Sequence, residues 1–290
     1  MFSFELLLNA VVAGLLLGGF YAAVSLGISV TFGFLEVANI AHPVFVIAGA
    51  YAAYVMNTVF ALDPILTGLL FTPLFYGLGV IVYRIYYVSF ERMGEESLRG
   101  LVFFFGLLFI IEVLLLLVYG VDYRLIEAPY IGSSVFIGPI GLSLRLFVPF
   151  IVGVTMTLAL YVFLARTFYG RAIMGVSQDS LALRLMGADP IQIKTIAFGL
   201  GIATASLAGS LLIVIAPVEP AIGREYIGRV FAIAVLGGMG SIGGTLTAAL
   251  ILGVAESLTS TFSGPSWALA VSFGLLLLTL AVRPSGLFGR

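Results

Sequence analysis

The stretch from Leu101 to Tyr119, LVFFFGLLFIIEVLLLLVY, decides the fold class of this chain. Glu112 is the only charged residue within it. As a helix, an apolar stretch of about 20 residues is long enough to cross the roughly 30 Å of hydrocarbon in a bilayer. We therefore expect a transmembrane helix here, with Glu112 near its centre.

Further apolar runs lie on both sides of this one. The complete set covers residues 6–34, 44–62, 65–88, 101–119, 146–164, 193–216, 230–258 and 267–282. The 290 residues are 61% hydrophobic and 9% charged, against about 45–50% and 25% in soluble domains. They also lack the ten-residue alternation of a membrane barrel. The sequence predicts an all-α polytopic membrane protein, a single transmembrane domain over residues 1–290. We expect about 8–10 transmembrane segments, some of them broken or re-entrant.

Composition also excludes several classes of function. The net charge of −1 provides no basic field for nucleic acid. The chain has no cysteine, and His42 is its single histidine, so we expect neither a disulfide nor a metal site. It contains no Gly-x-x-x-x-Gly-Lys phosphate loop, and we expect no cofactor. The first apolar run lacks a basic leader and a cleavage site, which favours a retained span over a signal peptide.

The basic residues predict the orientation of the spans, because Lys and Arg near span ends stay in the cytoplasm. Nine of them are expected inside: Arg84, Arg92, Arg99, Arg166, Arg171, Arg184, Lys194, Arg283 and Arg290. The other four are expected outside: Arg124, Arg145, Arg224 and Arg229. This partition gives a cytoplasmic C-terminus only if the long run 230–258 crosses the membrane twice.

That long run contains an interruption. Residues 237–244 read GGMGSIGG, and each glycine weakens a helix by about 1 kcal/mol relative to alanine. Irregular backbone at membrane depth persists only where protein or a water-lined cavity surrounds it. Gly237, Gly238 and Gly240 are therefore candidates for the lining of a translocation path, or for close packing between helices.

The most informative segment is the inner loop at about residues 166–194. Its signals are a helix cap at Asp179 or Ser180, an apolar face of Leu181 and Leu185 at i,i+4, and a stop at Gly187. They predict a short amphipathic helix between two spans. An exposed apolar face at this place requires a partner groove or the bilayer interface.

With these features in view, the chain resembles the permease subunits of ABC importers of the branched-chain amino-acid type. The resemblance covers nearly the whole chain and rests on short pieces in the same order and spacing. These are residues 18–22, 33–42, 208–209, 235–244, 253–256 and 283–289. One departure is Pro43, where the family usually has a glycine after its Asn-x-Ala-His; proline fixes the φ angle that glycine leaves free.

The resemblance implies that the loop helix is a coupling helix, which docks on a cytoplasmic ATPase subunit. The contact residues would be Arg171, Gln178, Asp179, Leu181, Arg184, Leu185 and Gly187. The implied partners are two ATPase subunits, a second homologous permease or a second copy of this chain, and an extracytoplasmic solute-binding protein. The implied setting is the bacterial inner membrane. The expected substrates are branched-chain amino acids, other amino acids, or small amides such as urea, and the chain itself would perform no covalent chemistry.

Polar residues at membrane depth are the remaining candidates for the translocation path. Asn39 and His42 lie in an expected break at residues 36–43, and Glu112 and Glu256 lie within apolar runs. A lone histidine is more often a structural donor than a ligand. Either glutamate could equally be a structural acceptor, bonded to Ser, Thr, Tyr or Arg of a neighbouring helix.

Two other classes of function stay open on the residues alone. One is a secondary transporter driven by an ion gradient, with Glu112 or Glu256 as its coupling carboxylate. The other is an intramembrane enzyme, which the missing cysteine and the lack of a recognisable nucleophile–base pair disfavour. The loop helix favours the ATP-driven importer, because a self-sufficient transporter has no need of it. For the loop itself, an interfacial helix resting on lipid headgroups is the alternative.

Overall fold

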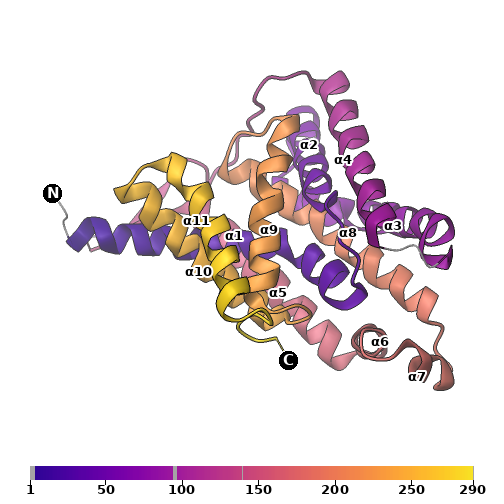
Figure 1. Ribbon diagram of the computed structural model, residues 1–290. Coiled ribbons are helices and arrows are strands. Elements are labelled where there is room, and N and C mark those ends of the chain that lie inside the picture. Colours follow the sequence, from indigo (N-terminus) through magenta and orange to yellow (C-terminus); the bar gives the residue numbers. More distant parts are fainter. Residues whose placement is uncertain (1–3, 94–96, 139, 290) are drawn as a thin grey trace.

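The computed structural model describes residues 4–93, 97–138 and 140–289 (Figure 1). Seven long helices carry most of this chain: α1 (Phe4–Leu35), α2 (His42–Phe60), α3 (Pro64–Ser89), α4 (Ser97–Tyr119), α5 (Leu144–Arg166), α8 (Pro190–Ile215) and α10 (Ile242–Phe262). The shorter helices are α6 (Phe168–Val176), α7 (Ser180–Leu185), α9 (Gly223–Gly237), α11 (Ala268–Val282), η1 (Glu91–Met93), η2 (Pro220–Ile222) and η3 (Pro265–Trp267). Within the described ranges, eight helical segments are long and apolar enough to cross a membrane, so the predicted polytopic helical fold is confirmed.

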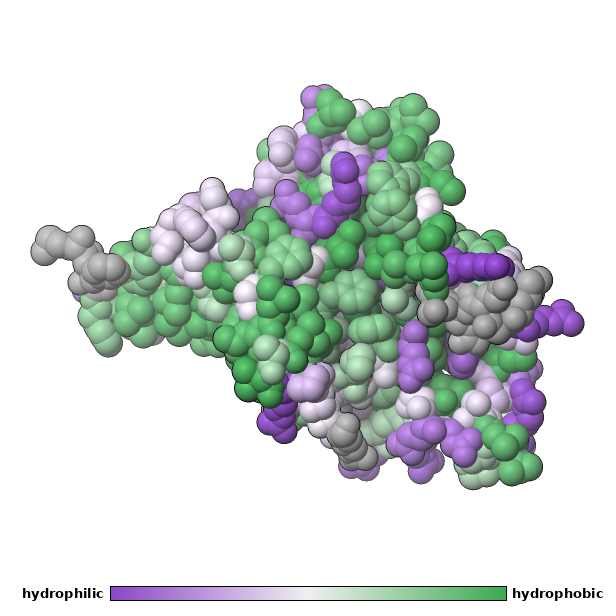
Figure 2. Space-filling model, viewed as in Figure 1, coloured by the Kyte–Doolittle hydropathy of each residue, from purple (hydrophilic) through white to green (hydrophobic). Residues whose placement is uncertain are grey.

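The helices form a bundle in which α1 and α8 occupy the interior. Figure 1 shows α1 running from the N-terminus into the middle of the molecule, and most residues of α1 and α8 are buried. By contrast, α4 and α11 expose most of their apolar side chains. Figure 2 shows hydrophobic residues over much of the visible surface, as expected for helices that face lipid.

Glycines allow the interior helices to touch along their backbones. A Cβ atom on Gly14 would lie 2.6 Å from the Cα of Val254, and one on Gly253 would lie 2.5 Å from the carbonyl oxygen of Gly14. Ser257 of α10 also donates to the carbonyl of Ala10, at 2.7 Å. Such close approach is how small residues hold helices together in membranes, where lipid removes the hydrophobic driving force.

Contacts between the connecting segments define two ends of the molecule. At the first, here called the α7 end, Lys194 pairs with Glu91, and the C-terminal tail (residues 283–289) returns to the end of α9. At the opposite end, Arg124 and Val218 form an isolated β-bridge. We call it the hairpin end, because the two-stranded hairpin of β1 (Ser134–Ile137) and β2 (Ile140–Ser143) lies there, with Gly141 bonded to Asn9.

The basic residues that contacts place at either end match the partition expected from the sequence, whereas Arg229, expected in an outer break, lies within α9 and pairs with Glu256. Lys194 and the tail after Arg283 lie at the α7 end, whereas Arg124 and Arg145 lie at the hairpin end, where the Arg145 Nε donates to the carbonyl of Val214. Arg290 lies outside the described residues. Which end faces the cytoplasm stays a prediction, because the contacts place the ends relative to each other and not relative to a membrane.

Both predicted interruptions are confirmed as breaks between helices. α9 ends at Gly237 and α10 begins at Ile242, and Gly238 and Gly240 between them have φ angles of 91° and 78°. This left-handed region favours glycine. Near the N-terminus, α1 ends at Leu35 and α2 begins at His42.

The glycine break is closed by the C-terminal tail. Leu287 N–H donates to the carbonyl of Leu236 at 2.8 Å, and Phe288 N–H donates to that of Gly237 at 3.3 Å. The last carbonyls of a helix lack partners within it. The tail therefore supplies donors to the end of α9.

Two elements were not expected from the sequence. The hairpin lies in a connecting segment outside the spans, where Phe136 pairs with Gly141 across the strands and covers the place a Cβ would fill. The other is α6, which begins one residue after Thr167, whose hydroxyl caps it by accepting from Gly170 N–H at 3.0 Å. Neither changes the arrangement of the membrane helices.

The contact between α1 and α10 should limit stability. We expect Gly253→Ala to lower the free energy of unfolding by about 1–3 kcal/mol, because the added methyl has no room against the backbone of α1. Gly106→Ala in α4 is the matched control, since a Cβ there meets nothing within 4 Å and alanine gains up to about 1 kcal/mol in helix propensity. Unfolding of the purified protein in detergent would measure both, and equal stability of the two variants would contradict the prediction.

Candidate coupling surface and translocation path

The predicted loop helix is present as α7 and begins as expected. Asp179 is its cap: the Oδ1 accepts from the N–H groups of Leu181 and Ala182, at 2.8 and 2.9 Å. Gly187, with φ of 85°, ends it, and its N–H donates to the carbonyl of Arg184 at 3.0 Å. Both ends of this short helix are therefore fixed by local hydrogen bonds.

One face of α7 packs on the protein and the other is free. Leu183 is buried and contacts α6 near Gly175. Leu181 and Leu185 are 64% and 82% exposed, so the predicted apolar face points away from the bundle. The other residues predicted for this surface are exposed as well: Arg171, Gln178, Asp179, Arg184 and Gly187. The structure thus brings the whole predicted coupling set together on α6, α7 and the turns beside them.

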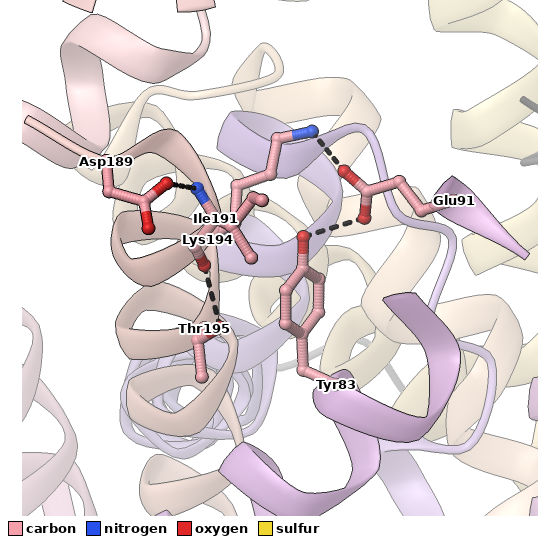
Figure 3. A network of polar contacts seen from close by, with 6 residues as sticks. All are labelled: Tyr83, Glu91, Asp189, Ile191, Lys194 and Thr195. Carbon is pink, nitrogen blue, oxygen red and sulfur yellow. Dashed lines mark hydrogen bonds and ion pairs between the residues drawn. The ribbon is translucent and has the colours of Figure 1, made fainter. Parts of the chain in front are cut away.

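A polar network joins the start of α8, the helix that follows α7, to the end of α3 and to η1 (Figure 3). Asp189 caps α8 directly after α7, accepting from Ile191 N–H at 3.0 Å. One turn further, Lys194 Nζ lies 2.5 Å from Glu91 Oε1, and the hydroxyl of Tyr83 in α3 donates to the other oxygen of Glu91 at 2.7 Å. The start of α8 is therefore tied to the end of α3.

Two hollows lie beside this surface. The smaller, of about 350 Å³, is polar and lies between the end of α1 and the α6–α7 turn, with Glu36, Gln178, Asp179 and Lys194 in its wall. The larger, of about 670 Å³, lies between Ser177, Phe288 and the glycine break. Of the three glycines predicted to line a path, Gly240 borders this larger hollow.

The other two predicted glycines serve close packing. A Cβ on Gly237 would lie 2.6 Å from the carbonyl carbon of Gly244 in α10, and one on Gly238 would collide with Gly289 of the tail. The sequence left open whether these glycines pack closely or line a path. In the structure Gly237 and Gly238 pack closely, whereas Gly240 borders the larger hollow.

Asn39 and His42 are buried at the junction of α1 and α2. His42 Nε2 donates to the carbonyl of Val24 at 3.0 Å, and its Nδ1 is buried with no partner among the described residues. Asn39 is fully buried, and neither its amide oxygen nor its amide nitrogen has a hydrogen-bond partner there. A buried polar group without a partner is rare and costly, so Asn39 is the least satisfied polar side chain of this junction.

Glu112 forms an ion pair with the first turn of α9. Its Oε1 lies 2.9 Å from the Nη2 of Arg224, whose side chain is 53% exposed. α4 also packs on α3 and α8, where the ring of Phe104 lies 5.2 Å from that of Tyr86 and 5.7 Å from that of Phe198. The ion pair adds a polar link from α4 to the start of α9.

Glu256 lies at the centre of a buried cluster that joins four helices. Tyr21 of α1 donates to its Oε2 at 2.5 Å, Arg229 of α9 to its Oε1 at 3.0 Å, and Ser272 of α11 bonds the same Oε1. The guanidinium of Arg229 also lies over the rings of Tyr21 and Tyr226, at 5.9 and 5.3 Å. This is the structural-acceptor arrangement considered from the sequence.

The path candidates do not converge as the coupling residues do. No hydrogen bond or ion pair of the described residues joins Asn39 or His42 to Glu112 or Glu256. Sequence reasoning did not identify the polar contacts of Glu91, Tyr21 or Ser272, because each becomes informative only through a partner on another helix. Over the described ranges, no three His, Asp or Glu side chains gather as a metal site requires.

Comparison with known proteins identifies the class. The family described as "Branched-chain amino acid transport system / permease component" matches residues 10–280. BraD of Pseudomonas aeruginosa, a high-affinity branched-chain amino acid transport permease, is 30% identical over 98% of this chain and 96% of its own length. LivH of Escherichia coli, with the same description, is 28% identical over 96% of this chain and 94% of its own. LivM of Escherichia coli matches a shorter part, 34% identical over 43% of this chain and 29% of its own.

The fold and the match over nearly the full length define a polytopic membrane permease. The chain belongs to the family of permease components of branched-chain amino acid transport systems. The resemblance seen in the sequence is confirmed.

Removing one partner of the buried Arg229–Glu256 pair should lower the free energy of unfolding more than removing both partners. We expect Arg229→Met to lower the free energy of unfolding by about 3–5 kcal/mol, because it leaves a buried carboxylate without its cation. Adding Glu256→Leu to Arg229→Met should restore part of the loss. Arg224→Met, which breaks the half-exposed pair with Glu112, should cost about 0–1 kcal/mol. Thermal unfolding in detergent measures all three, and an Arg229→Met protein as stable as the wild type would contradict this reading of the cluster.

Proposed function

We propose that this chain is the transmembrane permease subunit of an ATP-driven importer and forms half of its translocation path. Its substrates are branched-chain amino acids or related small polar solutes, namely other amino acids, amides or urea. The observation that carries the proposal is α7: a short helix capped at both ends, with an apolar face exposed on a polar end of the protein. Such a face is suited to a groove on a partner.

Two cytoplasmic ATPase subunits are the proposed partners at the α7 end. Leu181 and Leu185 would enter a groove of the ATPase, while Arg171 and Arg184, both exposed, would orient the contact through charge. The face is too small to hold the loop on lipid by itself, which favours a protein partner over the bilayer interface. A solute-binding protein would deliver the substrate at the hairpin end.

The second half of the path would come from another permease. The partial match to LivM, beside the nearly complete match to LivH from the same organism, supports a heterodimer with a homologous permease. A second copy of this chain is the alternative. The exposed apolar faces of α4 and α11 leave room for a partner helix as well as for lipid.

The contacts suggest how ATP binding would reach the path. Closure of the ATPase dimer would displace α7, and with it α8, which follows directly and is tied to α3 through Lys194 and Glu91. The larger hollow lies between the α6–α7 turn and the glycine break, so the same displacement would change the packing of α9 on α10. The path would then open to alternate sides of the membrane. The chain performs no covalent chemistry in this scheme.

The proposed location is the bacterial inner membrane, with the α7 end and the C-terminus in the cytoplasm. The charge partition supports it, because the segments expected inside lie together at one end. The ion-coupled alternative has less support, because Glu112 and Glu256 are each held in an ion pair with an arginine of α9.

The coupling proposal predicts a specific failure. In Leu181→Asp or Leu185→Asp, a carboxylate would enter the apolar groove, and an unpaired buried charge is strongly disfavoured. We expect the ATPase subunits to be lost on co-purification and uptake to fall, while the permease inserts normally, because both side chains are exposed in the subunit alone.

Phe136→Asp is the matched control, since Phe136 is equally exposed but lies on the hairpin at the opposite end. It should leave ATPase binding intact. Should both leucine variants retain the ATPase and wild-type uptake, the coupling role is wrong and the lipid-interface role takes its place.

The path proposal is tested by two asparagines with opposite expectations. Asn39→Ala should not lower stability by loss of a hydrogen bond, because the amide of Asn39 has no partner among the described residues. It should reduce uptake if this amide contacts substrate or water in another conformation of the transport cycle. Asn57 donates to the carbonyls of Leu62 and Glu127, so Asn57→Ala should lower the free energy of unfolding by about 1–3 kcal/mol and leave uptake per folded protein unchanged. Unaltered uptake by Asn39→Ala would remove Asn39 from the path.

A further inference from the structure

A cluster at the hairpin end has no role in the function described so far. Arg124 lies in the segment after α4 and is held by a β-bridge, with its N–H 2.8 Å from the carbonyl oxygen of Val218 and its own carbonyl 3.0 Å from Val218 N. Its Nη2 donates to the carbonyl of Tyr119 at 2.6 Å, and its guanidinium carbon lies 5.7 Å from the ring centre of Tyr54. The backbone and one end of the side chain are therefore well fixed.

Two hydrogen-bond donors of this cluster are buried with no acceptor. They are the Nε of Arg124 and the hydroxyl of Tyr51, and the described residues supply neither with a partner. Tyr51 is only 1% exposed, and its ring stacks on Tyr119 at 4.4 Å between centres. Because buried donors are nearly always paired in folded proteins, two orphans in one cluster point to an acceptor that comes from outside the chain.

A carboxylate of opposite charge accompanies them. Glu219 directly follows Val218, the bridge partner of Arg124, so the bridge brings the segment that carries Glu219 beside Arg124. Among the ion pairs of the described residues, none joins Arg124 to Glu219. A cation and an anion thus lie on two bridged segments of this cluster with no ion pair between them among the described residues.

We propose that Arg124, Tyr51 and Glu219 form a binding site at the hairpin end for the carboxylate and ammonium groups of a zwitterionic α-amino acid. The substrate carboxylate accepts from Arg124 Nε and from the Tyr51 hydroxyl, which gives both orphaned donors a charge-assisted bond. The substrate ammonium donates to Glu219. The rings of Tyr54 and Tyr119 border the site and suit an aliphatic side chain. The proposal rests on the proposed import of amino acids and adds the residues that receive them.

The bridge between Arg124 and Val218 is an isolated pair of backbone hydrogen bonds outside any sheet. Both residues lie in connecting segments, one after α4 and one before η2. Separation of these two segments would let Arg124 and Glu219 move to receive the amino acid without unfolding a helix.

The experiment measures thermal unfolding of the purified permease–ATPase complex with leucine and without the solute-binding protein. Leucine should raise the unfolding midpoint more than 4-methylpentanoate, which lacks the ammonium group, or 3-methylbutylamine, which lacks the carboxylate. Tyr51→Phe should leave the unliganded midpoint unchanged, because the hydroxyl has no partner to lose. It should weaken leucine binding about tenfold to hundredfold, as expected for one hydrogen bond to a charged group. Glu219→Gln should weaken leucine binding but not 4-methylpentanoate binding.

Tyr130→Phe is the control at the same end of the protein. The hydroxyl of Tyr130 donates to Asp63 Oδ2 at 3.1 Å, and burial together with the Asp63 carboxylate raises the pKa of Tyr130, which keeps the donor protonated. Tyr130→Phe should lower the unliganded midpoint and leave leucine binding unchanged.

Two results would overturn the proposal. One is a wild-type complex that leucine does not stabilise. The other is a Tyr51→Phe complex that binds leucine as tightly as the wild type, which would assign the missing acceptor to a water molecule. Neither touches the proposed importer function, which fails separately if no ATPase subunit co-purifies with the wild type.

Discussion

The contact of α1 with α10 is the constraint on which the rest of the bundle depends. α1 touches α2, α5, α8, α9 and α10, and it can lie among so many neighbours only because Gly14, Gly18 and Gly253 let two backbones meet without side chains between them. In hydrocarbon no hydrophobic force draws helices together, so packing at this distance and a few hydrogen bonds must hold them. The cluster around Glu256 lies on the same helices and adds directed bonds to that contact.

Polar groups in this fold divide into those that have a charged partner and those that are buried with none among the described residues. Glu256, Glu91 and Glu112 each have a cationic partner and connect helices that are distant in the sequence. Asn39, Tyr51 and the Nε of Arg124 are buried with no partner among the described residues. A satisfied group stabilises one conformation, whereas an unsatisfied one favours any state that provides a partner. In a protein that alternates between conformations, we therefore expect the substrate to contact the buried polar groups that have no partner.

Much of the fold could be predicted because membrane helices are encoded locally. The apolar runs, the breaks near residues 36–43 and 237–244, and the caps of α7 depend on neighbours in the sequence, and all are present. The exposure of Leu181 and Leu185 followed from their spacing and the polarity of the loop.

The site was less accessible to the same reasoning, because its contacts join distant segments. Nothing near Glu256 in the sequence names Tyr21 as its partner, and nothing near Arg124 names Val218 or Tyr51. The hairpin was missed because its two strands are short and pair through a glycine opposite an aromatic ring. The glycine run could be recognised as a helix break from the sequence. Which of its residues pack closely (Gly237 and Gly238) and which borders a hollow (Gly240) depends on the positions of α10 and the C-terminal tail.

The bonds from the C-terminal tail to α9 have a consequence for the order of biosynthesis. Leu287 and Phe288 supply the donors for the carbonyls of Leu236 and Gly237, and they leave the ribosome after α10 and α11. While those two helices enter the membrane, the end of α9 has to keep its carbonyls in contact with water or the insertion machinery. The hydrogen bonds that seal the glycine break can therefore form only after α10 and α11 have been made, although α9 precedes both in the chain.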